Sequence, residues 1–121
     1  FPERCASAGI PVVRRITGGG VIYHAAELTY AVVCAPRHIS DARGVKESFR
    51  ALTGFLLRFY GNLGIEASWA VDSADAGANF GGRTPLCFAG KEEYDIVAGG
   101  RKIGGNAQRR MKDVIFQHGS V

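Results

Sequence analysis

One apolar stripe with helical spacing runs through the middle of the chain. Its members follow one another at intervals of four, three, four, three and four residues, and they are Val45, Phe49, Leu52, Leu56, Phe59 and Leu63. Apolar side chains at this spacing share one face of an α-helix. We therefore predict a helix that is capped by Ser40 or Asp41, runs to about Asn62 and ends at Gly64, with the stripe packed in the core.

Short runs rich in β-branched and aromatic residues lie on both sides of the predicted helix. The clearest is residues 27–34, whose continuous apolar end is typical of a strand buried on both faces. Gly99 and Gly100 separate two further runs and predict a hairpin turn. A short helix over residues 2–8 would end at Gly9. The remaining runs, all predicted to be extended, cover residues 10–15, 21–24, 65–71, 94–97, 102–108 and 113–121.

The rest of the chain predicts one small domain. Residues 72–85 are rich in Ala, Gly and Asp, which predicts a loop rather than a linker between domains. With 121 residues, 46% of them hydrophobic and 21% charged, the chain can form one modest core and is not disordered. Because it opens on Phe1 and ends within a predicted strand, we expect residues 1–121 to be a single, truncated domain.

Charge is concentrated in two places. The chain carries 15 Lys and Arg against 11 Asp and Glu, a net charge of +4. The basic residues gather at Arg14, Arg15, Arg101, Lys102, Arg109, Arg110 and Lys112. Such clusters favour an acidic partner, although a solvated charged face has the same composition.

Cysteine content and hydropathy indicate in which cellular compartment the protein resides. Three widely spaced cysteines, at positions 5, 34 and 87, form no disulfide framework and indicate a reducing, cytoplasmic compartment. No apolar run reaches the ~18 residues of a membrane span. No Cys and His spacing resembles a zinc site.

Polar residues alternate along the run 102–108. With a strand period of two, Lys102, Gly104, Asn106 and Gln108 share one face. A glycine inside a strand often marks the close approach of a ligand or another backbone. The pattern indicates a lysine that points into a ligand groove, but a twisted edge strand with solvated polar residues has the same pattern.

A glycine run follows two arginines near the start of the chain. Thr17 and residues 18–20 (Gly-Gly-Gly) lie beside Arg14 and Arg15, so backbone amides there could cradle an anion. The spacing fits neither a Walker A loop nor a dinucleotide fingerprint. A flexible hairpin explains the glycines equally well.

Several motifs follow one another in a fixed order from about residue 10 to the end. They are RRITGGG (14–20), His24 with ELTY (27–30), CF (87–88), YDI (94–96), GRKIGGNAQRR (100–110) and QHGS (117–120). Together they resemble the biotin/lipoate A/B protein ligase superfamily, and the chain is most similar to its cysteine-dependent octanoyltransferases because of Cys87-Phe88 and the link from His24 to Glu27. Many relatives carry Asp directly after this histidine, whereas this chain has Ala25.

The resemblance implies a fold and a reaction. The fold would be α/β (α+β), a mixed, largely antiparallel sheet with packed helices, like class II aminoacyl-tRNA synthetases and biotin ligases, present as a fragment of the full domain. Cys87 would attack the thioester of an octanoyl (or lipoyl) carrier protein, and Lys102 would lower the thiol pKa and hold the developing oxyanion. A lysine of a lipoyl domain or of a glycine-cleavage H-type protein would accept the acyl group.

The resemblance also implies a set of substrate-binding residues. These are Arg14, Arg15, Thr17, Gly18, Gly19, Gly20, His24, Gly104, Asn106, Gln108 and His118. The two histidines are candidates for proton handling or carbonyl contact, or are simply packed and hydrogen-bonded. No tightly bound cofactor or metal, nucleic acid or membrane is expected.

Two other functions fit the same residues. An ATP-dependent lipoate–protein ligase would form a lipoyl-adenylate, with ATP and Mg²⁺ near the arginines and the glycine run and with Lys102 on the carboxylate. A non-catalytic basic module would bind nucleic acid or an acidic protein in a salt-sensitive way.

Overall fold

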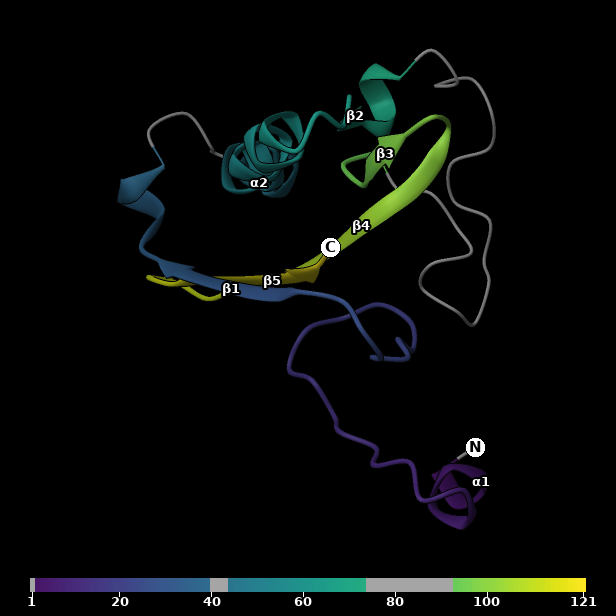
Figure 1. The fold of residues 1–121 in the computed structure, drawn as a ribbon. Helices are drawn as coiled ribbons and strands as arrows, with labels where there is room; N and C mark the ends of the chain where they lie inside the picture. Colours follow the sequence, from purple (N-terminus) through teal and green to yellow (C-terminus); the bar gives the residue numbers. More distant parts are fainter. Residues whose placement is uncertain (1, 40–43, 74–92) are drawn as a thin grey trace.

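One long helix covers one face of a five-stranded sheet (Figure 1). The computed structural model describes residues 2–39, 44–73 and 93–121. The sheet order is β1-β5-β4-β3-β2, and every neighbouring pair is antiparallel. The strands are β1 (Thr29–Cys34), β2 (Ser68–Trp69), β3 (Ile96–Ala98), β4 (Arg101–Arg110) and β5 (Ile115–Ser120), and the helices are α1 (Pro2–Ser7) and α2 (Val45–Asn62), with 3₁₀ turns η1 (Pro36–His38) and η2 (Ala70–Asp72). The predicted α/β class is confirmed.

The helix α2 ends where the sequence predicts but begins later. The helix stops at Asn62, and Gly64 has the left-handed backbone conformation, with φ +74°. Its N-cap is Gly44, so the prediction of a cap at Ser40 or Asp41 is wrong, and both of these residues lie outside the described part of the chain. The extended backbone of Gly44 is held in place from the sheet, because Arg110 Nη1 donates a hydrogen bond of 2.9 Å to its carbonyl.

The core lies where α2 crosses β3 and β4. Leu56, Tyr60 and Ile96 form its buried centre, with Ile103 and Val121 packed against them. The Tyr60 hydroxyl donates to the Ile103 carbonyl at 3.1 Å, and burial raises the pKa of this tyrosine. The apolar ring and its hydrogen-bonded hydroxyl thus join α2 to β4.

The prediction that the whole apolar stripe of α2 lies in the core is wrong. Leu56 is buried, but Val45 and Leu63 are 52% and 60% exposed and Phe59 is also exposed. Polar Ser48 and Thr53 are fully buried in their place. The helix is rotated toward these residues because they bond to sheet side chains, as Trp69 Nε1 does to Thr53 Oγ1 at 2.9 Å.

Five of the predicted strands and turns are confirmed and three are corrected. The first strand, β3, the Gly99-Gly100 hairpin, β4 and the last strand are present, and both glycines have positive φ. The prediction that the first strand is buried on both faces is wrong, because β1 lies at the sheet edge and Val33 is 67% exposed. Residues 10–15 and 21–24 form no strand, and residues 65–71 contain only the two-residue β2 followed by η2. A strand needs a neighbour to receive its hydrogen bonds, and the largely exposed segment from Ile10 to His24 has one bridge residue, Val21.

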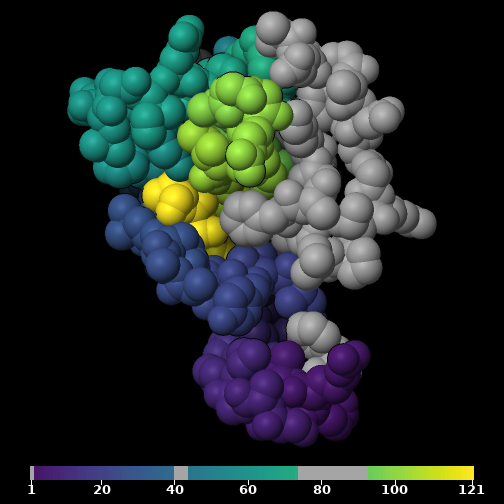
Figure 2. Space-filling view, turned by 45° about the vertical axis from the view of Figure 1, so that its right-hand side comes forward, coloured from purple at the N-terminus to yellow at the C-terminus, as the bar shows by residue number. Residues whose placement is uncertain are grey.

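The N-terminal segment lies on the side of the sheet away from α2. In Figure 1 it passes below the sheet, and in Figure 2 α1 projects from the rest of the molecule. The α1 helix matches the prediction for residues 2–8, and no residue within its bounds is buried. Among the helices that the structure describes, none combines the length and apolarity needed to cross a lipid bilayer.

Candidate functional site

A β-bulge in β4 divides the predicted polar face. Ile96 pairs with Gly104, whereas the next residue, Val97, pairs with Lys102, so Ile103 is an extra residue on this strand. Ile103 packs against the core below α2. The prediction that Lys102 shares a face with Gly104, Asn106 and Gln108 is therefore wrong, because the bulge breaks the strand period of two.

The two sheet faces can be defined from these pairings. The helix face, under α2, carries Gly104, Asn106, Gln108 and Arg110 of β4 and Ile115, Gln117 and Gly119 of β5. The opposite face, which we call the lower face, carries Lys102, Gly105, Ala107 and Arg109 of β4 and Phe116, His118 and Ser120 of β5. Predicted site residues thus lie on both sides of the sheet.

On the lower face, Lys102 forms a buried ion pair. Its Nζ lies 2.7 Å from Asp95 Oδ2, and each side chain is only 6% exposed. Asp95 lies two residues before Val97, the strand partner of Lys102, so the register brings the two charges together. A buried charge needs such a partner, because its desolvation is otherwise too costly.

Sequence reasoning gave Asp95 no role. The available signal was an acidic residue directly before the apolar run Ile96-Val97, next to a hairpin whose other strand begins with a lysine. Opposite charges that face each other across a hairpin favour a pair. The Lys102 ammonium of this pair could bind a negatively charged atom of a substrate.

His118 lies on the same face and contacts the predicted anion loop. Its Nε2 is 2.6 Å from Thr17 Oγ1, and its ring stacks on Phe116 with 5.3 Å between ring centroids. Partial burial lowers the pKa of His118, and electrostatic interactions with Arg15 and His24 lower it further. The imidazole is therefore neutral at pH 7 and can exchange a hydrogen bond with a hydroxyl.

The loop that carries Thr17 is held against the sheet and closed on itself. Arg109 Nη1 donates to the Ile16 carbonyl at 2.8 Å, and Arg15 Nη2 donates to the Gly20 carbonyl at 2.9 Å. Gly19 adopts φ +97°, which favours glycine. The structure thus brings the loop to His118, while Gly18 and Gly20 remain exposed.

His24 contacts a carboxylate that sequence reasoning did not assign to the site. Its Nδ1 is hydrogen-bonded to Glu27 Oε1, and the Ala25 N–H donates to Glu27 Oε2 at 2.7 Å. The Ala25 amide, followed by the His24 side chain, lowers the pKa of Glu27. Glu27 therefore orients His24 although the chain has Ala25 directly after the histidine. The ELTY motif was the signal for it.

On the helix face, Asn106 and Gln108 belong to a buried polar network. The chain of hydrogen bonds runs from Arg110 Nη1 to Ser48 Oγ (2.9 Å), from Ser48 Oγ to Gln108 Oε1 (2.8 Å), from Gln108 Nε2 to Gln117 Oε1 (2.8 Å), from Gln117 Nε2 to Tyr30 Oη (3.2 Å) and from Tyr30 Oη to Asn106 Oδ1 (2.5 Å). Gly104 packs against Ile96 and Val121 on this face. The structure therefore does not bring these three residues to Lys102 and His118, and their substrate-binding roles stay predictions.

Two predicted site residues remain to be placed. Arg14 is exposed on the segment before the glycine loop. Cys87 lies outside the described residues, so its position relative to Lys102 stays a prediction. In the parts of the chain that are described, no group of three or more His, Cys, Asp or Glu is arranged to hold a metal ion.

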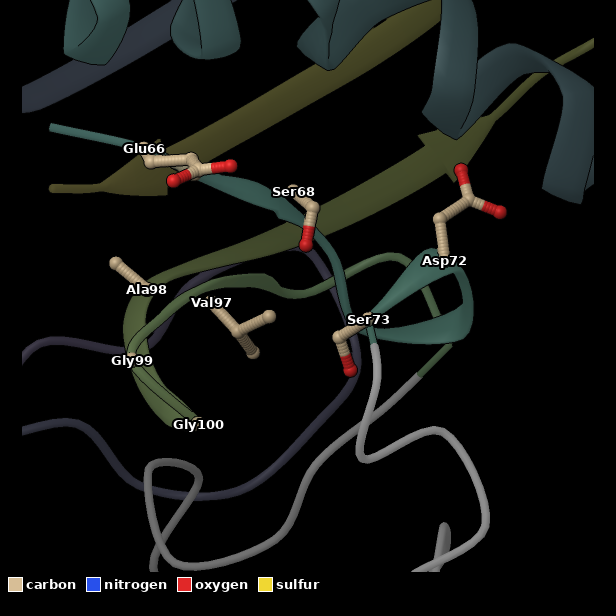
Figure 3. Close-up of a pocket in the computed structure, with 9 residues that line it drawn as sticks. Glu66, Ser68, Asp72, Ser73, Val97, Ala98, Gly99 and Gly100 are labelled. Carbon is tan, nitrogen blue, oxygen red and sulfur yellow. The ribbon is translucent and has the colours of Figure 1, made fainter.

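A cavity of about 460 Å³ opens at the β2 edge of the sheet, beside the β3–β4 hairpin (Figure 3). Its wall consists of Glu66, Ala67, Ser68, Asp72, Ser73, Val97, Ala98, Gly99 and Gly100. Asp72 is paired with Arg50 at 3.0 Å, and Ser73 Oγ donates to the Ala70 carbonyl at 2.8 Å. None of the predicted site residues lines this cavity, so we place the candidate site on the lower face.

The fold is that of lipoate–protein ligases. A solved lipoate-protein ligase A bound with ATP matches with a TM-score of 0.73 and 25% identity, and the match covers 100% of this chain and 43% of the ligase. The T. acidophilum protein Ta0514, solved with bound lipoic acid, matches equally well, over 100% of this chain and 44% of that protein. The predicted fold family is confirmed.

The chain belongs to the lipoyl protein ligase A/B catalytic domain family, whose model matches residues 2–121. Its relatives include the octanoyltransferase LipM of Bacillus cereus (41% identical over 111 residues) and those of Oceanobacillus iheyensis and Exiguobacterium sibiricum (37% identical over 110 and 121 residues). These matches cover 90%, 91% and 98% of this chain but only 40%, 38% and 44% of the three relatives. The chain therefore spans about two fifths of their length.

Proposed function

We propose that this chain is part of a catalytic domain that transfers an octanoyl (or lipoyl) group from a carrier-protein thioester to a lysine of a lipoyl-carrier protein. The observation that carries the proposal is the buried Lys102–Asp95 pair on the sheet face that also holds His118 and Thr17. The similarity to octanoyltransferases, at 37–41% identity, supports acyl transfer in lipoate metabolism.

The reaction would proceed in two steps. The Cys87 thiolate attacks the carbonyl carbon of the octanoyl thioester, and the carrier leaves as a thiolate that takes up a proton. A neutral lysine amine of the acceptor then attacks the new thioester on Cys87, forms an amide, loses a proton and releases the cysteine. Each step places negative charge on the same carbonyl oxygen.

Lys102 would stabilise that charge. Its ammonium is fixed by Asp95 in a buried position, and a cation held in a site of low dielectric stabilises an oxyanion without first having to reorganise. The same ammonium would favour the thiolate of Cys87 if the cysteine lies beside it. Asp95 would act as a positioning residue.

The anion loop and the histidines would complete the site. His118, neutral and joined to Thr17, would exchange a proton or a hydrogen bond with the substrate, as would His24 with its partner Glu27. Arg14, Arg15 and Arg109 give this end of the lower face a positive potential, which suits an acidic carrier or acceptor protein. We propose a cytoplasmic enzyme that needs no tightly bound cofactor.

The most direct test of the first step is intact-protein mass spectrometry. After exposure of the whole protein to octanoyl carrier protein, we expect a mass increase of one octanoyl group that is absent in Cys87→Ser. A Cys87→Ser protein that still carries the octanoyl group would contradict the assignment of the nucleophile, and an unmodified wild-type protein would contradict the transfer mechanism.

An ATP-dependent ligase remains the second candidate. It is favoured by the match to a lipoate-protein ligase A that was solved with ATP bound. Incubation with ATP, Mg²⁺ and lipoate separates the two: a lipoyl-adenylate formed equally by wild type and Cys87→Ser would support the ligase.

A further inference from the structure

Ser120 carries a buried hydroxyl that nothing in the described structure satisfies. Ser120 is only 2% exposed, and its Oγ has no hydrogen-bond partner among residues 2–39, 44–73 and 93–121. Buried hydroxyls are nearly always hydrogen-bonded, and an orphan needs an explanation. An absent ligand that provides the missing partner is one such explanation.

The position of Ser120 on the sheet supports this explanation. It lies on β5 two residues after His118, so both side chains are on the lower face. Its strand neighbours are Thr29 of β1 and Gly105 of β4. Gly105 has no side chain, so only backbone lies beside Ser120 on β4. Lys102 is on the same strand, three residues before Gly105.

The second buried polar atom without a hydrogen-bond partner among the described residues lies on the opposite face of the sheet from Ser120. Asn106 Nδ2 also lacks a partner among the described residues, but it lies on the helix face, within the network of Tyr30 and Gln117. Ser120 alone of the two shares a face with Lys102 and His118. Along β4, Gly105 is three residues from Lys102, or about 10 Å at the rise of a strand, a span that a lysine side chain can largely cross.

We propose that Ser120 binds the acyl substrate by donating a hydrogen bond to its carbonyl oxygen, opposite Lys102. An octanoyl chain is apolar except at its carbonyl, so this oxygen is the only acceptor that the acyl group offers. The hydroxyl would strengthen its bond as the oxygen becomes negative, which places Ser120 among the oxyanion donors. This proposal rests on the function proposed above.

The test is the rate at which Ser120→Ala forms the octanoyl adduct. With the whole protein and octanoyl carrier protein under single-turnover conditions, we expect the rate to fall by roughly 100-fold, the lower end of the range for loss of one oxyanion donor. The thermal midpoint should stay the same or rise slightly, because the lost hydroxyl leaves behind no partner among the described residues. Ser7→Ala, on the exposed helix α1, is the matched control and should keep the wild-type rate.

Each outcome decides the matter. An unchanged rate in Ser120→Ala overturns the proposal while leaving the transferase function intact, because the wild type still forms the adduct in the same series. A lower rate together with a clearly lower thermal midpoint also overturns it, since Ser120 would then serve the fold. If wild type forms no adduct, the proposed function fails and the role of Ser120 fails with it.

Discussion

Lys102 Nζ and Asp95 Oδ2 lie 2.7 Å apart across the β3–β4 hairpin, on the face of the sheet opposite α2. The bulge at Ile103 produces this relationship, because it turns Lys102 away from the core that Ile103 enters. A bulge that redirects a side chain next to a functional site is a common device. The ion pair is the feature on which the proposed function depends.

Removal of one partner of this pair should destabilise the fold. In Asp95→Asn the carboxylate that faces the buried ammonium is lost, and we expect the free energy of unfolding to fall by about 3–5 kcal/mol. Urea denaturation measures the change. Glu93→Gln is the control, because it breaks the exposed Lys46–Glu93 pair and should cost no more than about 1 kcal/mol. Equal losses in the two variants would show that the Asp95 pair is not effectively buried.

Gly119 is required by close packing on the helix face. A Cβ at this position would lie 2.6 Å from the Gly105 carbonyl and 2.7 Å from Tyr30 Cε1. We expect Gly119→Ala to lower the free energy of unfolding by about 1–3 kcal/mol or more, as overpacking does. In Gly54→Ala, in the middle of α2, the new Cβ meets only Arg58 Nη1 at 4.0 Å, so a gain of up to about 1 kcal/mol is expected. A neutral Gly119→Ala would mean that the Tyr30 ring is not packed on this strand.

The Tyr30 hydroxyl joins two amides of the buried network. It donates to Asn106 and accepts from Gln117, and burial raises its pKa. Tyr30→Phe leaves both amides short of a partner, so we expect a loss of about 1–3 kcal/mol in denaturant unfolding. Tyr23→Phe, at a tyrosine that is 71% exposed, is the control and should change stability by less than about 0.5 kcal/mol. A loss of similar size in both would contradict the network.

The lowered pKa of His118 should affect how the stability of the protein depends on pH. Its folded pKa lies below the ordinary 6.5, chiefly because of partial burial. The unfolded chain then binds more protons than the folded one at mildly acidic pH, so this histidine costs stability as pH falls below 6.5. His118→Gln should lose less stability than wild type between about pH 6.5 and 5. Parallel stability curves for the two proteins would contradict the lowered pKa.

The sequence predicts elements well where a local pattern determines them. Residues 29–34, the end of α2 and the Gly99-Gly100 turn follow from β-branched content, helical period and the freedom of glycine to adopt positive φ. The failures have non-local causes. The stripe of α2 is partly exposed because Ser48 and Thr53 bond across to the sheet, and such partners are far away in the sequence.

In the candidate site, too, local motifs predicted some residues, and contacts with other segments determine the rest. The motifs identified Lys102, Thr17 and His118, which the structure places on one face. The spacing of two wrongly put Asn106 and Gln108 on the same face as Lys102, and their substrate-binding roles stay predictions. One extra residue, Ile103, reverses the alternation. The adjacent Gly104-Gly105 pair is compatible with a bulge, but a glycine in a strand marks a close approach equally often, so the sequence does not locate the extra residue. Asp95 was not assigned a role because its contact with Lys102 depends on the register of the hairpin, and Ser120 because its interest lies in an unfilled hydrogen bond. Glu27 has a local partner, His24, and was missed although the ELTY motif contains it.

The complete transfer reaction, carried out without ATP, tests the central claim most directly. The whole protein is incubated with octanoyl carrier protein and an unmodified lipoyl domain, which is the acceptor. The mass of the lipoyl domain is then measured by mass spectrometry. We predict one octanoyl group on the acceptor lysine, with transfer abolished in Cys87→Ser and strongly reduced in Lys102→Met. An acceptor that is modified only when ATP and free acid are supplied, or equally well by Cys87→Ser, would contradict the account.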